Sequence, residues 1–396
     1  MSLNETPRAN RLHIGIFGKR NSGKSSLINA LTGQEIALVS DVAGTTTDPV
    51  YKSMEIHGIG PCVFIDTAGF DDEGELGQMR VGKTKQASEK ADIALILFSD
   101  EDVEDGIKWI ETFRKRNTPV IPVINKIDIL DNITEISKTI FDRTDLKPIE
   151  ISVKNKEGIE RIREEIIRQL PEDYEGIGIT GDLVQEGDVV MMVMPQDIQA
   201  PKGRLILPQV QTLRDLLDRK CIAVCTTTDK MDQALASLSN PPDLIITDSQ
   251  AFKIVYEKKP EQSKLTSFSI LFANYKGDLN YFVESVRAID SLTEKSKVLI
   301  AEACTHAPLS EDIGREKIPA LLRKRIGENL SINVVSGADF PTDLSTYNLI
   351  IHCGACMFNR KHVLSRIEHA RSYGVPMTNY GVTLAYLSGI LEKIDL

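Results

Sequence analysis

The first residues that could do chemistry form the run Gly-Lys-Arg-Asn-Ser-Gly-Lys-Ser at positions 18–25. This run has the pattern GxxxxGK(S/T), in which glycines let a loop wrap around phosphate groups and backbone N–H groups point at them. A strand-like stretch precedes it and a helix-like stretch follows, so a helix N-terminus also faces the phosphates. We expect Lys24 to contact the β- and γ-phosphates of a nucleotide and Ser25 to bind Mg²⁺. The predicted contacts from this loop are Gly18, Asn21, Ser22, Gly23, Lys24, Ser25 and Ser26.

Two further runs could complete the magnesium and γ-phosphate site. The DTAG run at 66–69 follows an apolar stretch, so the Asp66 carboxylate can hold Mg²⁺ through water and the Gly69 N–H can contact the γ-phosphate. The GTTTD run at 44–48 can supply a threonine hydroxyl to Mg²⁺ once a switch loop orders around the γ-phosphate. We predict Ser25, Thr46 and Asp66 as magnesium ligands and Thr45 as a further nucleotide contact. The predicted catalytic set is Lys24, Thr46, Asp66 and Gly69.

Two later motifs indicate which base is bound. The NKID run at 125–128 ends an apolar stretch, and the Asp128 carboxylate can accept hydrogen bonds from N1 and N2 of guanine. Adenine lacks that pair of donors, so the motif selects guanine. The SVK run at 152–154 suits backbone contact with guanine O6. The sequence therefore predicts a GTP site whose guanine side is formed by Asn125, Lys126, Asp128, Ser152, Val153 and Lys154.

A second group of residues that could do chemistry lies near the C-terminus. Cys304 and His306 follow one strand-like run, and His352, Cys353 and Cys356 follow another. In C-x-x-C a tight turn brings two sulfurs to one metal. If the two runs are strands of one parallel sheet, their ends can place Cys304 beside this pair. Three interpretations stay open: structural zinc, a redox pair, or an iron–sulfur cluster with three cysteine ligands and one exchangeable position. The spacing alone does not decide between zinc and iron–sulfur.

The elements that position these groups are short apolar runs that alternate with helical stretches. From residue 12 to about 170 the alternation is typical of a parallel sheet covered by helices. Strand-like and helix-like runs alternate again from about 181 to 260 and from about 265 to the end, without a clear internal repeat. We predict an α/β fold: a P-loop GTPase domain with a mainly parallel sheet, followed by two smaller α/β domains.

Composition limits the cellular setting. The chain has 396 residues and a formal charge of −10, which argues against broad binding to nucleic acid or anionic membranes. No apolar run approaches the roughly 20 residues that span a bilayer, and the polar N-terminus has no signal-peptide core. Six cysteines are too few for a disulfide framework and indicate a reducing compartment. We expect a cytoplasmic protein.

Residues 10–170 resemble the small GTPases of translation-factor type, and most closely the subgroup that contains MnmE (TrmE) and Era. The GTTTD run, the phosphate-loop Asn and the DTAGF run carry this resemblance. Ras-like proteins have a water-orienting Gln where this chain has Phe70, which implies slow intrinsic hydrolysis. The resemblance implies a potassium ion held partly by Asn21, and a catalytic carboxylate just after the DTAG run. Its candidates are Asp71, Asp72, Glu73 and Glu75, which could equally form a solvated acidic loop.

The whole chain resembles the FeFe-hydrogenase maturation GTPase (HydF) family, because a GTPase domain is followed by C-x-H and H-C-x-x-C. The resemblance implies a GTP-binding domain (1–172), a small α/β domain expected to mediate dimerisation (173–263) and an iron–sulfur cluster-binding domain (264–396). Cys304, Cys353 and Cys356 match the cysteines of the family's 4Fe–4S cluster. The fourth ligand stays open between His306 or His352, water, and a carboxylate such as Glu302 or Glu311.

The same resemblance implies a homodimeric scaffold and carrier. Two radical SAM maturation enzymes would build a transient two-iron precursor with CO, cyanide and dithiolate ligands, and this protein would deliver it to apo FeFe-hydrogenase. The main alternative is an MnmE- or Era-like GTPase of tRNA modification or ribosome assembly with a structural zinc site. The sequence contains no RNA-binding module signature in its support. A GTP-regulated redox protein that uses Cys353 and Cys356 is a further alternative.

Overall fold

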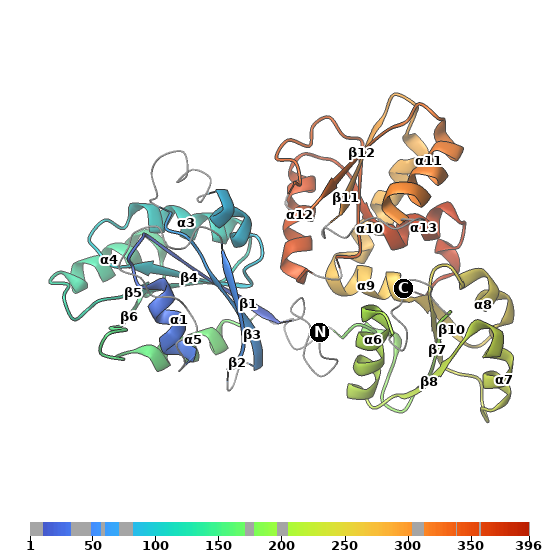
Figure 1. Cartoon of the computed structure of the whole chain (residues 1–396), viewed down its shortest axis with the longest axis horizontal. Coiled ribbons are helices and arrows are strands. Elements are labelled where there is room, and N and C mark those ends of the chain that lie inside the picture. Colours follow the sequence, from blue (N-terminus) through green and yellow to red (C-terminus); the bar gives the residue numbers. More distant parts are fainter. Residues whose placement is uncertain are drawn as a thin grey trace. The chain divides into compact units, whose positions relative to one another are not determined.

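The computed structural model describes residues 11–32, 49–56, 60–70, 82–170, 178–195, 205–302, 313–337, 339–355 and 358–395. The chain divides into two compact units, Met1–Tyr174 and Glu175–Leu396, and in both of them helices pack on sheets (Figure 1). Within the described ranges, no helix is both long and apolar enough to cross a membrane.

The first unit is built on a six-stranded, mostly parallel sheet. Its strands are β1 (Leu12–Gly18), β2 (Val50–Ile56), β3 (Gly60–Asp66), β4 (Ile93–Phe98), β5 (Val120–Ile124) and β6 (Ile149–Glu150). They lie in the order β2-β3-β1-β4-β5-β6, and only the β2–β3 pair is antiparallel. Every residue of β1 and β4 is buried, as expected for a parallel sheet that is covered on both faces.

Helices cover both faces of this sheet. They are α1 (Lys24–Thr32), α3 (Glu104–Lys115), α4 (Ile133–Thr144) and α5 (Ile159–Arg168). Leu27 of α1 and Ile162 of α5 belong to one apolar cluster with the sheet, whereas Ile110 of α3 and Ile140 of α4 belong to another. The two clusters lie on opposite faces, because alternate residues of the strands contribute to each.

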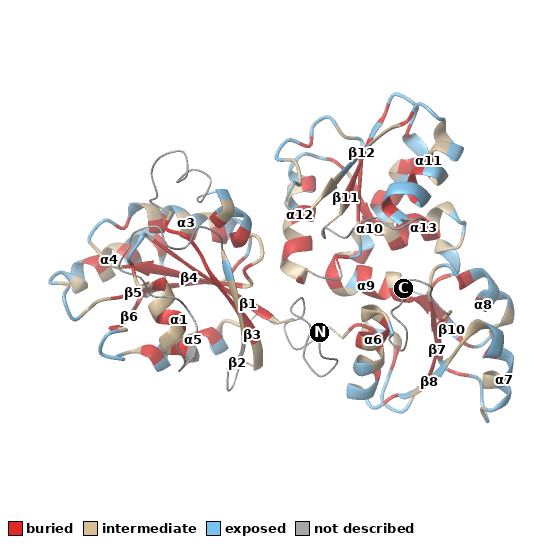
Figure 2. Cartoon of the chain, viewed as in Figure 1, coloured by how far each residue is buried: buried red, intermediate tan, exposed pale blue. Residues whose placement is uncertain are grey.

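The second unit contains two four-stranded parallel sheets, whose strands are buried except at the edges β8 and β12 (Figure 2). The strands of one sheet are β7 (Val189–Val193), β8 (Ile222–Thr226), β9 (Leu244–Thr247) and β10 (Lys264–Ser267). Those of the other are β11 (Lys297–Glu302), β12 (Ser331–Ser336), β13 (Leu349–His352) and β14 (Met377–Asn379). The orders are β10-β9-β7-β8 and β12-β11-β13-β14.

Helices connect these strands. The first sheet carries η2 (Gly181–Leu183), α6 (Leu207–Asp218), η3 (Thr228–Lys230), α7 (Met231–Ala236), α8 (Phe252–Lys258) and α9 (Phe268–Lys276). Next come α10 (Leu279–Val286), η4 (Arg287–Ser291), the π-helix η5 (Ile313–Lys317), α11 (Ile318–Ile326), α12 (Arg360–Ser372), α13 (Tyr380–Leu387) and η6 (Leu391–Lys393).

The two sheets of the second unit have the same topology and the same register. In each, the first strand is flanked by the second and the third, and the fourth lies outside the third. Val190 pairs with Leu244 as Val298 pairs with Leu349, and Leu265 pairs with Ile245 as Met377 pairs with Ile350. This makes Thr247 of β9 the positional equivalent of His352 of β13. The structure thus contains an internal repeat that the sequence did not reveal.

The structure shifts one expected domain boundary. The chain divides after residue 174, and the expected boundary after residue 172 stays a prediction. The expected boundary after residue 263 comes too early, because β10 begins at Lys264 and completes the first of the two sheets by pairing with β9. One apolar cluster contains residues of both sheets, such as Met191 and Ile300, so the two sheets share a core.

Candidate functional site

The predicted phosphate loop lies between β1 and α1. Gly18 ends β1 and Lys24 begins α1, as the motif requires. Gly23 has φ +96°, and a Cβ atom there would lie 2.3 Å from the side-chain nitrogen of Asn125, so only glycine fits. Asn21 also has a left-handed backbone, with φ +57°. The loop therefore contains two residues with left-handed backbone conformations, as a sharp turn requires.

The Lys24 ammonium lies within this loop. Its Nζ donates hydrogen bonds to the carbonyl oxygens of Gly18 (2.9 Å) and Lys19 (2.7 Å), and the side chain is buried. An ammonium group held here by carbonyl oxygens is positioned to exchange them for the phosphate oxygens of a nucleotide.

Ser25 and Asp66 lie together as predicted. β1 and β3 are parallel neighbours, which places Ile16 opposite Asp66, and the Ser25 hydroxyl donates to Asp66 Oδ2 at 2.6 Å. Burial raises the pKa of Asp66, while the bond from Ser25 and the charge of Lys24 oppose the rise. The other oxygen, Asp66 Oδ1, is buried and has no hydrogen-bond partner among the described residues. A buried carboxylate oxygen in this state suits a hydrated cation.

The predicted guanine side is also assembled. Asn125 follows β5; its Nδ2 donates to the Ser22 carbonyl at 2.8 Å, and its Oδ1 accepts from the Val153 N–H at 3.2 Å. Ser152 donates to Asp128 Oδ1 at 2.7 Å, and this hydrogen bond lowers the pKa of Asp128. Lys154 Nζ lies 3.8 Å from Asp128 Oδ2. Lys126, in the same loop, has a left-handed backbone with φ +66°.

Phe70, which follows the DTAG run, packs on an aromatic stack. Its ring centroid lies 6.2 Å from that of Trp109 on α3, and Trp109 in turn stacks on Phe17 of β1 at 5.6 Å. The chain's one tryptophan therefore packs between the rings of Phe17 and Phe70. Thr45 and Thr46, and the acidic candidates Asp71, Asp72, Glu73 and Glu75, lie outside the described residues.

Sequence reasoning missed one set of contacts at the phosphate loop. Lys19 Nζ lies 2.8 Å from Asp100 Oδ1 and 2.9 Å from Asp102 Oδ2, in the loop after β4. Burial lowers the pKa of Lys19, but the hydrogen bonds to the two carboxylates outweigh it and raise the pKa overall. The acidic run that follows the apolar stretch at 93–98 was the available signal.

The two strand ends that bear the C-terminal cysteine motif are neighbours. β11 and β13 are parallel, Ala301 lies opposite His352, and the Cys353 N–H donates to the Ala301 carbonyl at 2.9 Å. Cys304, His306, Glu311 and Cys356 lie outside the described residues. Among the residues that the structure does describe, no three His, Cys, Asp or Glu side chains form a group that could hold a metal ion. The predicted adjacency of the strand ends is therefore confirmed, whereas the ligand set is not tested.

Two candidates for a fourth ligand already have partners. The Glu302 carboxylate accepts from Arg315 Nη2 at 3.0 Å and from the Ser336 hydroxyl at 2.9 Å. His352 is fully buried, and both of its ring nitrogens have hydrogen-bond partners. Arginines therefore hold the side chains at the ends of β11 and β13.

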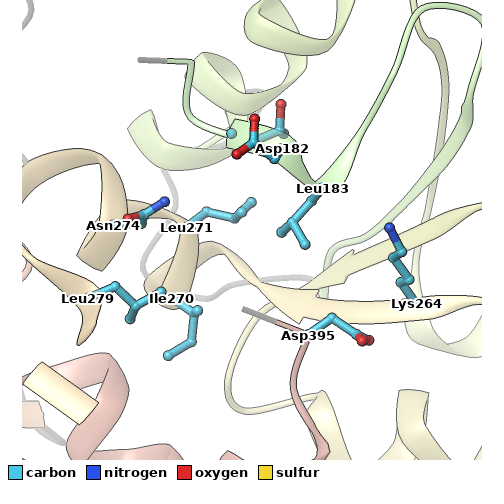
Figure 3. Close-up of a pocket in the computed structure, with 10 residues that line it drawn as sticks. Asp182, Leu183, Lys264, Ile270, Leu271, Asn274, Leu279 and Asp395 are labelled. Carbon is cyan, nitrogen blue, oxygen red and sulfur yellow. The ribbon is translucent and has the colours of Figure 1, made fainter. Parts of the chain in front are cut away.

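A cavity of about 360 Å³ lies elsewhere in the second unit, beside β10 and α9 (Figure 3). Its polar lining includes Asp182, Lys264, Asn274 and Asp395, and apolar side chains such as Leu183 and Leu271 also line it. It shares no residue with the nucleotide site or with the cysteine motif.

Comparison with known protein families assigns both units. The hydrogen maturase F dimerization domain matches residues 179–277, and the hydrogen maturase F tetramerization domain matches residues 280–394. A GTPase model described as "50S ribosome-binding GTPase" matches residues 13–126. The two hydrogen maturase F matches together span more than half of the chain. The chain belongs to the hydrogen maturase F family.

Curated relatives of this hydrogen maturase F chain match its GTPase part. GTPase Der of Wolinella succinogenes is 38% identical over 180 residues, which are 42% of this chain and 37% of that protein. The tRNA modification GTPase MnmE of Endomicrobium trichonymphae is 38% identical over 168 residues, 40% of this chain and 35% of that protein. The chain thus covers little more than a third of these relatives. The predicted GTPase domain is confirmed by these matches and by the GTPase model.

Solved structures of GTPases match part of the chain at low similarity. A crystal structure of Era with MgGDPNP and part of 16S ribosomal RNA is 21% identical and has a TM-score of 0.37, with 54% of this chain and 92% of that chain covered. NFeoB from S. thermophilus bound to GDP.AlF4- and K+ is 20% identical and has a TM-score of 0.32, with 39% and 60% covered. The predicted fold class is confirmed by the GTPase model and by the mostly parallel sheet of the first unit. At such scores the likeness carries no functional argument.

Proposed function

We propose that this hydrogen maturase F chain is a GTP-hydrolysing scaffold that carries a two-iron precursor of the FeFe-hydrogenase active site to apo-hydrogenase. One observation carries the proposal. A chain of this family contains two features. One is the set of contacts at the predicted GTP site, and the other is the pair of neighbouring strand ends, of β11 and β13, that lead into a three-cysteine motif.

At the GTP site, Lys24 would contact the β- and γ-phosphates, while Ser25, Thr46 and Asp66 would hold Mg²⁺. The buried, unpartnered Oδ1 of Asp66 supports a cation at this point. The ion would neutralise charge on the phosphates during transfer of the γ-phosphoryl group to water. The Gly69 N–H would contact the γ-phosphate.

Hydrolysis would be slow and stimulated by potassium. Phe70 stacks on Trp109 and has no group that could orient a water molecule. Asn21 lies in the phosphate loop with a left-handed backbone, and we propose it as a potassium ligand. The ion would supply positive charge to the transition state in place of an arginine finger.

In the second unit, Cys304, Cys353 and Cys356 would bind a 4Fe–4S cluster. Thiolates are the ligands that such clusters use, and the Cys353 backbone is tied to β11. A Cβ atom added at Gly354 would have no atom of a described residue within 4 Å. The cluster would supply an iron position at which the two-iron precursor attaches.

We propose radical SAM maturation enzymes as donors of the precursor, apo FeFe-hydrogenase as its acceptor and the cytoplasm as the setting. The names of the two matched domains indicate an oligomer, and the expected homodimer is its simplest form. With a net charge of −10, the chain has no general attraction for nucleic acid.

The test is activation of apo-hydrogenase. Protein made together with the two radical SAM enzymes is purified anaerobically and mixed with apo-hydrogenase, and hydrogen evolution is measured. We expect activity from this protein, and none from protein made without those enzymes or from Cys353→Ser. No activation by protein that contains its iron–sulfur cluster would contradict the carrier role.

A further inference from the structure

The His352 side chain, at the end of β13, is enclosed. None of it is exposed to solvent, and its Nδ1 lies 2.7 Å from the carbonyl oxygen of Cys353. Its Nε2 lies 2.9 Å from Nη1 of Arg366 on α12. The imidazole therefore connects the first cysteine of the C-x-x-C run to a helix that comes after that run.

These partners fix the tautomer of the ring. A guanidinium group only donates hydrogen bonds, so His352 Nε2 must accept and carries no proton. A carbonyl oxygen only accepts, so His352 Nδ1 must carry the proton and donate to Cys353. The lone pair that could bind a metal therefore points at Arg366.

Arg366 is itself held on several sides. It is 3% exposed, its Nη2 donates to the Gly337 carbonyl at 2.6 Å, and its guanidinium carbon lies 4.7 Å from the centre of the Phe340 ring. Gly337 follows β12, so Arg366 joins the end of β12 to the end of β13. A buried guanidinium with these partners is costly to displace.

The internal repeat supports a structural role for the His352 position. Its equivalent in the other sheet, Thr247, is also fully buried, and its hydroxyl donates at 2.9 Å to the carbonyl of Val193 on β7. In both sheets, the last residue of the third strand therefore uses its side chain to bond a backbone carbonyl at the carboxyl edge.

We propose that Arg366 is a positioning residue for the C-x-x-C run that begins at Cys353. It acts through His352, whose role is structural and which is not an iron ligand. Arg366 holds His352 Nε2, and His352 Nδ1 holds the Cys353 carbonyl, so the pair sets the direction in which the chain leaves β13. This inference rests on the proposed 4Fe–4S cluster.

The test uses three variants of the full chain, reconstituted anaerobically with iron and sulfide. Arg366→Met removes the donor, Arg366→Lys keeps the charge but loses the two-pronged geometry, and His352→Gln keeps an acceptor near the position of Nε2. For each, the rate of iron loss to a chelator and the EPR spectrum of the reduced cluster are measured. GTP hydrolysis and the melting temperature report on folding.

We expect Arg366→Met to lose iron about tenfold faster than the parent, because a buried charge-assisted hydrogen bond is removed. Arg366→Lys should lose iron at a rate between those of the parent and of Arg366→Met. This variant keeps the test valid if Arg366→Met does not fold. His352→Gln should keep the EPR spectrum of the parent, because the iron ligands are unchanged.

Two results would overturn the inference. A changed spectrum in His352→Gln would make His352 an iron ligand, and parent-like iron loss in both Arg366 variants would remove the positioning role. A parent that binds no iron–sulfur cluster would instead overturn the proposed function, and this inference with it.

Discussion

The side-chain amide of Asn125 donates a hydrogen bond of 2.8 Å to the carbonyl oxygen of Ser22. The same side chain accepts from the N–H of Val153 and is only 2% exposed. Asn125 therefore links the phosphate loop to both loops of the guanine side. A displacement of one loop should displace the others.

Asn125→Ala should weaken GTP binding roughly tenfold, because the Ser22 carbonyl and the Val153 N–H lose their side-chain partner, a loss of about 1–3 kcal/mol. Titration calorimetry with GTP and GDP measures this. Asn132→Ala is a matched control, since Asn132 bonds the exposed Glu101 side chain and should leave affinity unchanged. Parent-like affinity in Asn125→Ala would show that the two loops are independent.

Asp128→Asn should weaken GTP and favour xanthosine triphosphate. The carboxylate would accept from guanine N1 and N2, and loss of a charged acceptor is worth about 1.5–3 kcal/mol, or roughly tenfold or more. Competition binding of the two triphosphates measures the change. Since the bond from Ser152 lowers the pKa of Asp128, the carboxylate stays ionised in mild acid, and the parent's preference for guanine should hold as the pH falls toward about 5. Unchanged GTP affinity in the variant would remove the guanine assignment.

Potassium should accelerate GTP hydrolysis relative to sodium. Asn21 in the phosphate loop and the stacked Phe70 motivate this prediction, and sodium's shorter oxygen distances suit the loop poorly. Rates are compared in chloride salts of equal ionic strength. The matched variant Asn21→Ala should hydrolyse GTP at similar rates in both salts. If the parent shows equal rates in the two salts, Asn21 is an ordinary loop residue.

Much of the nucleotide site could be predicted from sequence because its groups follow strands of one parallel sheet. β1 and β3 are neighbours in the sheet, which brings Ser25 to Asp66. The loops after β1 and β5 lie at the same edge of the sheet, which brings Ser22 to Asn125. Lys19 with Asp100 and Asp102 was not predictable in this way, since their pairing depends on the path of a loop.

The second unit was harder to predict because apolar strands look alike. The repeat is visible in registers such as Val190–Leu244 and Val298–Leu349, which sequence patterns do not specify. The expected boundary after residue 263 falls before β10, whose place in the first sheet depends on its pairing with β9 and not on a motif. The role of His352 depended on Arg366, which lies on a later helix and has no motif of its own.

Substitutions in the two units should affect GTP turnover and iron content separately. Lys24→Ala should lose GTP turnover and keep iron, because the P-loop lysine is removed and the cysteines are untouched. Cys353→Ser should lose most of its iron and hydrolyse GTP within a few-fold of the parent, because a serine hydroxyl is a poor iron ligand at neutral pH. Iron analysis and GTP turnover of both variants, purified in parallel, measure this. If Cys353→Ser kept its full iron content, the cluster assignment would be wrong.

The most direct measurement for the account as a whole is the content of iron, sulfide and zinc in anaerobically purified parent protein. We predict a brown protein with about four iron and four sulfide per chain, as a 4Fe–4S cluster requires, and little zinc. Zinc at about one per chain without sulfide, or neither metal, would contradict the scaffold and favour a structural zinc site or a dithiol at the three cysteines.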